Sequence, residues 1–429
     1  MMKAIRIAST SISIVLLSCQ ILLGQGGTWT TEAPLPSRIV EAASGVIGCK
    51  LYVVGGFGAV DRLSSTLAYD PVTNTWEART PMPAVRNEAV GAVVDGMLYI
   101  IGGFDSQGYA VGAVEAYNPR TDTWSEKAPM PTPRWRAAAG VVDGLIYVAG
   151  GFDEYAEDLT TLIVYDPKTD NWITKAPEPT GGGGAASAVI GGVLYVAGGL
   201  HVGPGATSLR TVQAYDPRTN SWSTKTPAPF EFDSAVSGVI DGKLYVAGGS
   251  NVSQSGGFAV KNTLLAYDPS SDSWLLAPSM PTARFSAGGG VIDDALYVAG
   301  GEGDKFSFPL VNEAFSPYLS VTIRVNPTSI NLKSNGKIDA VILSWNTFDA
   351  TSVNPETVTL AGASVVTEEN GTPVFTFDDV NGDGILDLIV HFRARDLQLT
   401  NTDTQVVLKG QTFGGQLIKG VALIRIVPQ

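Results

Sequence analysis

Cysteine and histidine are scarce in this chain, with two of each among 429 residues. Cys19 lies in an N-terminal segment that we expect to be removed, and Cys49 then has no partner for an internal disulfide. His201 and His391 lie far apart in sequence. No zinc motif, nucleophile elbow or phosphate-binding loop is present. Packing rather than covalent or metal cross-links must therefore stabilise the fold.

Basic residues are also few, since 28 Lys and Arg stand against 41 Asp and Glu and the net charge is −13. Nucleic-acid phosphates require a basic surface, so a nucleic-acid partner is excluded. Charged residues make up only 16% of the chain, whereas glycine occurs 49 times. This composition, with many Val, Ala and Tyr, is typical of a β-rich chain with many turns.

The N-terminus has the pattern of a signal peptide over residues 1–26. Lys3 and Arg6 precede a mostly apolar stretch over 7–23, and small residues follow, with cleavage expected near Gly26. The alternative is a lipoprotein in which Cys19 of "LLSC" is lipidated. We prefer the signal peptide because the apolar run continues past Cys19. The sequence thus predicts a secreted or cell-surface protein without a transmembrane segment in the mature chain.

The dominant pattern is a repeat of about fifty residues. "YDPRTNSW" at 215–222 has close copies at 69–76, 117–124, 165–172 and 267–274. Double glycines beginning at Gly55, Gly102, Gly150, Gly198, Gly248 and Gly300 are 47, 48, 48, 50 and 52 residues apart. Each unit contains four strand signals, and the unbroken apolar second strand must be covered on both faces. A ring of four-stranded sheets provides that cover.

The sixth unit lacks its fourth strand, because no Trp follows Phe315 at the expected distance. "GTWTTEAPLP" at 27–36 matches the missing piece, so we expect the N-terminal strand to close the ring. In this ring the Tyr of "LYV" and the Trp of "SW" are expected to be anchors between neighbouring sheets.

The double glycine, the Tyr before the Asp-Pro turn and the Trp of the outer strand resemble kelch repeats. The resemblance covers 27 to about 317 and implies an all-β fold, a six-bladed kelch β-propeller closed by the N-terminal strand. Kelch propellers serve as binding platforms, scaffolds and occasionally enzymes, so the resemblance does not select a function.

The period stops near Leu319, and seven short strand signals follow, which predicts a small β-sandwich over 318–429. Its "DDVNGDGILDL" places Asp379, Asn381, Asp383, the backbone oxygen of Ile385 and Asp387 at the spacing of a Ca²⁺ loop. Position 12 is Val390 rather than Glu and strands flank the loop, so it resembles the DxNxDG loops of secreted β-proteins rather than an EF-hand. We expect a structural Ca²⁺ ion there, with an ordinary Asx-rich turn as the alternative.

Arginines recur in the links that lead into the innermost strands. Arg86, Arg134 and Arg284 lie 13 residues before the next "LY" tyrosine, and Arg38 lies 14 before. We expect them to ring the mouth of the central channel and to bind an anionic ligand, together with Glu88, Trp135 and Arg136 of the same links. The alternative is a structural habit of the repeat, in which each Arg ties neighbouring sheets through backbone carbonyls or adjacent acids.

Two functions fit these observations. The first is a secreted binding or scaffold protein that recognises a glycan or protein partner, expected to be anionic, at the mouth or at the long loops of the fourth and fifth units. The second is an enzyme resembling the kelch family of sialic acid epimerases (mutarotases), with Arg86 and Glu88, or Arg134 and Glu231, as an acid–base pair beside the substrate carboxylate. We favour the non-enzymatic function. A copper oxidase resembling galactose oxidase is rejected, because it needs more His and Cys than this chain has.

Overall fold

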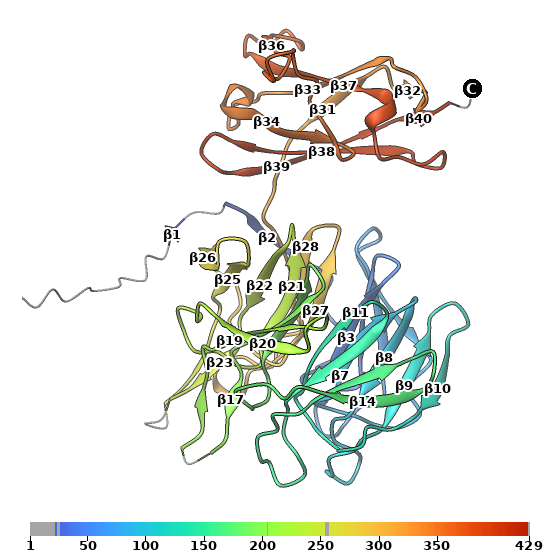
Figure 1. The fold of residues 1–429 in the computed structure, drawn as a ribbon, viewed down its shortest axis with the longest axis vertical. Coiled ribbons are helices and arrows are strands. Elements are labelled where there is room, and N and C mark those ends of the chain that lie inside the picture. Colours follow the sequence, from blue (N-terminus) through green and yellow to red (C-terminus); the bar gives the residue numbers. More distant parts are fainter. Residues whose placement is uncertain (1–21, 24–25, 204, 254–256, 428–429) are drawn as a thin grey trace, which may run out of the picture.

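The computed structural model describes residues 22–23, 26–203, 205–253 and 257–427, and they form an all-β protein in two parts (Figure 1). The predicted signal segment lies almost entirely outside the described residues, apart from Leu22–Leu23 and Gly26. None of the described segments is a helix of the length and apolar character needed to cross a membrane.

The first part contains six sheets built to one plan, each with four antiparallel strands within the described residues. We number these sheets 1 to 6 in the order in which the chain forms their innermost strands. The strands are given from the innermost to the outermost. Sheet 1 contains β3 (Ala43–Ile47), β4 (Lys50–Val54), β5 (Thr66–Asp70) and β6 (Thr75–Arg79); sheet 2 contains β7 (Val90–Val94), β8 (Met97–Ile101), β9 (Val114–Asn118) and β10 (Thr123–Lys127); sheet 3 contains β11 (Ala138–Val142), β12 (Leu145–Ala149), β13 (Leu162–Asp166) and β14 (Asn171–Lys175). Sheet 4 contains β15 (Ala186–Ile190), β16 (Val193–Ala197), β19 (Val212–Asp216) and β20 (Ser221–Lys225); sheet 5 contains β21 (Val236–Ile240), β22 (Lys243–Ala247), β25 (Leu264–Asp268) and β26 (Ser273–Ala277); sheet 6 contains β27 (Gly288–Ile292), β28 (Ala295–Ala299), β29 (Asn312–Ser316) and β2 (Thr28–Glu32). Short β1 (Leu22–Leu23) adds in parallel to β26.

The innermost strands contact one another in cyclic order, from β3 through β7, β11, β15, β21 and β27 back to β3. Strand β2 comes from the other end of the sequence and pairs with β29, so that Trp29 lies opposite Phe315. Their rings are 5.4 Å apart between centroids, and Trp29 Nε1 donates to the backbone oxygen of Pro278, 2.8 Å away in sheet 5.

The repeated octapeptide ties each outer strand to the preceding sheet. In sheet 1, Tyr69 Oη donates to Asn74 Oδ1 at 2.7 Å, and the same oxygen accepts the backbone N–H of Ala33. Trp76 Nε1 donates to the carbonyl of Ala33 at 2.9 Å. The same three hydrogen bonds, from the Tyr hydroxyl, the backbone N–H of the preceding sheet and the Trp indole, recur in sheets 2 to 5 with donor–acceptor distances of 2.5–3.1 Å. The residues that take the place of Asn74 there are Asp122, Asp170, Asn220 and Asp272. The Trp bonds cross to the preceding sheet, as expected for an anchor between sheets. The other expected anchor, the Tyr of each "LY" step, packs on the octapeptide aromatic ring of a neighbouring sheet, as Tyr52 does on Tyr117 with ring centroids 5.8 Å apart.

The second part consists of a five-stranded sheet, a four-stranded sheet and the two-stranded pair β32–β40 around one hydrophobic core, which includes Ile342, Val358 and Phe392. Its strands are β30 (Leu319–Ser320), β31 (Ile323–Asn326), β32 (Ser329–Ile330), β33 (Lys337–Ile342), β34 (Val353–Leu360), β35 (Ala363–Ser364), β36 (Phe375–Asp378), β37 (Asp387–Arg393), β38 (Gln405–Thr412), β39 (Leu417–Leu423) and β40 (Arg425–Ile426). Each of the seven strand signals in the sequence overlaps one of them. We call this part the C-terminal domain.

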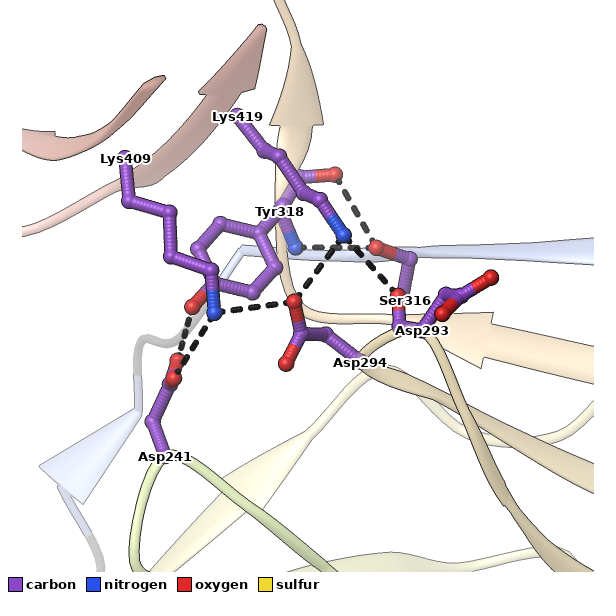
Figure 2. Close-up of polar contacts among 7 residues, drawn as sticks. All are labelled: Asp241, Asp293, Asp294, Ser316, Tyr318, Lys409 and Lys419. Carbon is purple, nitrogen blue, oxygen red and sulfur yellow. Dashed lines mark hydrogen bonds and ion pairs between the residues drawn. The ribbon is translucent and has the colours of Figure 1, made fainter. Parts of the chain in front are cut away.

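The C-terminal domain rests on the hairpin turns of sheets 5 and 6, through a polar junction around Tyr318 (Figure 2). The Tyr318 hydroxyl donates to Asp241, and Lys409 Nζ lies 3.2 Å from Asp241 and 2.8 Å from Asp294. Lys419 Nζ pairs with Asp294 at 2.9 Å and donates to the backbone oxygen of Asp293. Figure 1 places this junction at the end of the six sheets opposite to β17 (Leu200–His201) and β23 (Ser250–Val252).

We expect Asp294→Asn to weaken the junction, because the substitution removes the carboxylate that two lysines share. Partly exposed ion pairs contribute up to about 1 kcal/mol each. Asp294→Asn should therefore lower the unfolding midpoint in urea, and added salt should shrink the difference from the wild-type protein.

Asp293→Asn is the matched control, since it changes the charge equally while Asp293 contributes its backbone oxygen to the junction. Both residues have positive φ, which Asn tolerates. Equal midpoints for the two variants would contradict the assigned role of Asp294.

Candidate functional site

The centre of the six sheets is closed by a cycle of backbone hydrogen bonds at the end opposite to the C-terminal domain. One residue from each link takes part: Glu41, Glu88, Arg136, Gly184, Ser234 and Ser286. Each N–H donates to the carbonyl of the preceding member at 2.7–3.0 Å, and Glu41 donates to Ser286. All six have positive φ, between 52° and 69°. We call these residues the central ring.

The central ring lines a small cavity of about 130 Å³, together with the alanine that follows each member. A larger cavity of about 540 Å³ adjoins it and shares Glu41, Glu88 and Arg136 with it. This larger cavity, which we call the mouth cavity, lies off the centre, toward sheets 6, 1 and 2. Its wall contains aromatic, basic and acidic side chains: Phe57, Phe104, Trp135, Phe306 and Phe308; Arg38, Arg62 and Arg136; Glu41, Glu88 and Glu302; with Val40 and Asn87.

A chain of polar contacts runs across the floor of the mouth cavity. Arg136 Nη2 and Nε lie 2.6 and 2.8 Å from Glu88 Oε1, and Nη2 lies 4.0 Å from Glu41. Glu41 accepts a hydrogen bond from Asn87 Nδ2 at 2.7 Å, and Asn87 Oδ1 accepts one from Arg62 Nε at 2.6 Å. Two carboxylates and two guanidinium groups are thus linked through one amide.

Burial raises the pKa of Glu88 to about 7, with a further rise from Glu41, and Arg136 opposes this change. Glu88 can therefore exchange its proton near neutral pH, which is where a carboxyl group can act as an acid or a base. Burial also raises the pKa of Glu302, with a smaller rise from Glu41, while Arg38 lowers it.

Arg38 and Arg62 form no ion pair with any residue in the described ranges, although both line the mouth cavity. The Arg38 guanidinium lies over the Phe308 ring, 3.0 Å from its centroid, and its buried Nε has no hydrogen-bond partner among the described residues. Arg62 lies 5.9 Å from the centroid of Phe104. Positive charge without a carboxylate partner suits an incoming anion.

A cluster of aromatic rings forms another part of the wall of the mouth cavity. The Trp135 ring packs on Phe104 and Phe152 at centroid distances of 4.9 and 4.6 Å, and Arg136 lies 5.6 Å from its centroid. Trp135 Nε1 donates to the backbone oxygen of Asp153 at 2.9 Å, which orients the indole.

Four of the predicted ligand-binding residues meet in this cavity: Arg38, Glu88, Trp135 and Arg136. The expected position at the mouth is wrong for Arg86, Arg134 and Arg284, which are 3%, 1% and 1% exposed. Each turns into its sheet, where carbonyl groups near the double glycines need donors.

The buried arginines have defined partners. Arg86 pairs with Glu115 at 2.8 Å and bonds the carbonyl of Gly102, while Arg134 bonds the carbonyls of Gly150 and Thr161. Arg284 pairs with Glu313 at 2.8 Å and bonds the carbonyl of Val298. These contacts match the alternative interpretation, in which the arginines tie the structure together.

Neither expected acid–base pair forms. Glu88 pairs with Arg136 instead of Arg86, and Glu231 does not line the mouth cavity. Glu41, Arg62, Asn87 and Glu302 also line this cavity and were not predicted from the sequence. Glu41 could have been found by aligning the repeat on the alanine that follows Glu88 and Arg136, whereas Arg62 and Glu302 lie in variable loops without such a signal.

The predicted Ca²⁺ loop has hard oxygen donors on alternate residues, which is the ligand type that Ca²⁺ takes. Asp379 accepts the N–H groups of Gly382, Asp383 and Gly384, which curls the loop around this carboxylate. Asp387 is buried and accepts the N–H groups of Ser344 and Val380. No group of three or more His, Cys, Asp or Glu side chains in the described ranges is close enough to hold a metal ion. The loop thus offers mixed Asp, Asn and carbonyl oxygen donors and, among the described residues, no preformed cluster of carboxylates.

The repeat region is similar to known kelch-repeat proteins. A family model described as the KLHDC2/KLHL20/DRC7 Kelch-repeats domain matches residues 126–301, and the Kelch motif matches 38–83 and 86–131. A solved structure titled "Structure of YjhT" is similar with a TM-score of 0.58 at 18% sequence identity, over 66% of this chain and 96% of that one. No curated protein matches by sequence. The chain therefore carries kelch repeats and has the all-β architecture of a kelch-type propeller.

Proposed function

We propose that this protein is an exported binding protein whose mouth cavity takes an anionic ligand, a glycan that carries a carboxylate. The observation that carries the proposal is the position of Arg38 and Arg62, which face the cavity without an ion-pair partner in the part of the chain that the structure describes. The cavity wall carries three arginines and three glutamates, and with Glu88 protonated the arginines are in excess, which favours an anion on a chain of net charge −13. The aromatic wall suits the apolar faces of sugar rings.

We further propose that the six repeat sheets are the blades of a six-bladed propeller, with residues 1–26 removed and the strand at 28–32 closing the ring. The pairing of β2 with β29 and the cyclic contacts of the inner strands support this architecture. The lipoprotein route through Cys19 is the alternative mode of export. A ring fixed at its centre gives the binding residues a rigid support.

A second function, epimerisation or mutarotation of an acidic sugar, is favoured by one specific observation. Glu88 has a pKa near 7 and lies at the edge of both cavities, beside the paired Arg136. Such a group could move a proton to or from a bound sugar.

Removal of the guanidinium groups of Arg38 and Arg62, which have no ion-pair partner among the described residues, is expected to weaken anion binding strongly. Each charge-assisted hydrogen bond contributes about 1.5–3 kcal/mol, so Arg38→Ala/Arg62→Ala should weaken binding of an acidic sugar by at least about a hundredfold. Calorimetric titration with N-acetylneuraminic acid and glucuronic acid measures this, with galactose as the neutral comparison.

Arg210→Ala is the matched control, because Arg210 is exposed in a loop of sheet 4 outside the mouth cavity and carries the same charge. An equal loss in the control, or no binding of either acid by the wild-type protein, would refute the proposed site.

Anion affinity should fall as the pH rises through about 7. Below this value Glu88 is neutral and Arg136 is available to a ligand, whereas above it the carboxylate occupies Arg136 and repels an anion. The native state also binds this proton more tightly than the unfolded chain, so stability declines as the pH rises from the ordinary pKa of 4.5 to about 7. Titrations between pH 5.5 and 8.5, compared with Glu88→Gln, test the assignment; a Gln variant with an unchanged pH profile would contradict it.

We propose that the loop at 379–387 binds Ca²⁺ and stabilises the C-terminal domain. Extracellular sites of this kind bind with a Kd of about 10⁻⁴–10⁻³ M, so about 10 mM Ca²⁺ should add roughly 1–3 kcal/mol of stability. Asp383→Asn should lose the Ca²⁺-dependent rise in melting temperature, while Asp378→Asn, just outside the motif, should keep it. A wild-type melting temperature that does not differ between EGTA and Ca²⁺ would exclude the ion.

A further inference from the structure

Three aromatic side chains at loop tips around the mouth cavity are exposed to solvent. Tyr109, Tyr155 and Phe306 are 68%, 77% and 81% exposed. They belong to the loops between the second and third strands of sheets 2, 3 and 6. Large apolar side chains that stay exposed at the rim of a cavity usually contact a ligand or partner.

Hydrogen bonds fix the backbone of two of these loops. The Asp105 carboxylate accepts the N–H groups of Gln107 and Tyr109 at 2.9 and 3.0 Å. Asp153 does the same for Tyr155 and Glu157 at 2.8 and 2.9 Å. A ring on a preorganised loop loses little conformational freedom when it binds.

All three loops are continuous with the mouth cavity. Phe306 lines the cavity itself. The Arg62 guanidinium reaches the loop of Tyr109, since a Cβ placed on Gly108 would lie 3.5 Å from Arg62 Nη2. The loop of Tyr155 begins at Asp153, whose carbonyl accepts the hydrogen bond from Trp135. A ligand longer than the cavity would therefore leave it over these rings.

The balance of charge differs between the cavity and the loops. In the cavity three arginines face Glu41, Glu88 and Glu302, so that positive charge is available there. The exposed rings are flanked mainly by carboxylates, which are Asp105, Glu154, Glu157 and Asp304, with Lys305 as the one basic neighbour in sequence. An anionic group is favoured inside, and a second one farther out would meet carboxylates. The part of the ligand outside the cavity should be neutral.

We propose that the ligand is an oligosaccharide that ends in a single carboxylate-bearing sugar, with the acidic residue in the mouth cavity and the neutral sugars stacked on Tyr109, Tyr155 and Phe306. This inference rests on the proposed function and extends it from one sugar to a chain. A protein partner fits less well, because the core of a protein interface is depleted in charge, whereas carboxylates stand beside each of these rings.

The test compares ligands that share one acidic sugar. Calorimetric titration would use N-acetylneuraminic acid, sialyllactose, lactose and polysialic acid, and also glucuronic acid with a xylotriose that carries one glucuronic acid at its end. For at least one acid we expect the oligosaccharide to bind at least tenfold more tightly than the free acid. Lactose should not bind measurably, and the polyanion should bind less tightly than sialyllactose.

The double variant Tyr109→Ala/Tyr155→Ala, which leaves the wall of the mouth cavity intact, should lose the advantage of the oligosaccharide and keep the affinity for the free acid. Phe258→Ala is the control, because Phe258 is 59% exposed in the hairpin between the second and third strands of sheet 5, on the same end of the molecule, and does not line the mouth cavity. Circular dichroism and melting temperature verify that each variant is folded.

The outcomes separate the two proposals. If a free acid binds through Arg38 and Arg62 but its oligosaccharide binds no more tightly, the extended ligand is refuted and the proposed function stands. An equal loss of acid and oligosaccharide in the double variant also refutes it. If neither acid nor any oligosaccharide binds, both proposals fail, and a protein ligand captured by the wild-type protein but not by the double variant would then replace them.

Discussion

The central ring constrains most of what is specific about this protein. Its six N–H groups and six carbonyls have no strand partner at the point where the links turn into the inner strands, and the cycle pairs them with one another. The geometry requires positive φ, which costs about 1–2 kcal/mol for a residue with a side chain, yet five of the six members are not glycine. The paired backbone groups offset that cost. The same geometry brings the side chains of Glu41, Glu88 and Arg136 around one small space.

A second set of contacts holds the outside of the sheets. There the Tyr, the Asn or Asp of the turn, and the Trp of each octapeptide join an outer strand to its neighbour, with Trp29 providing the bond to sheet 5 from the N-terminal strand. Inner and outer contacts together leave little freedom between the sheets. The variable loops are therefore carried on a rigid support, as binding loops often are.

Arginines of one chain have two different roles here, and environment decides between them. Arg86 and Arg284 are buried against acidic partners, so removal of either would leave an uncompensated carboxylate inside the protein. Arg38 and Arg62 lie in a cavity that water can enter, and rest on aromatic rings. The first pair contributes to the integrity of the fold, and the second pair is available for recognition. At the other end, the lysines of the C-terminal domain meet the acidic hairpin turns of sheets 5 and 6, which leaves the mouth uncovered.

The repeat, the order of the strands and the anchoring roles of Tyr and Trp could be predicted from the sequence, because these features depend on local pattern and recur from unit to unit. The sequence also predicted that residues of the links form the mouth, among them Arg38, Glu88, Trp135 and Arg136, which line the mouth cavity. The direction of each link side chain, by contrast, depends on the folded structure. Arg86 and Arg136 occupy nearby positions in successive links. Arg86 turns toward Glu115 inside its sheet, whereas Arg136 turns toward Glu88 at the centre. That choice depends on partners brought from other repeats, as does the arrival of Arg62 beside Asn87, and such long-range proximity is not encoded in the spacing of the residues along one unit.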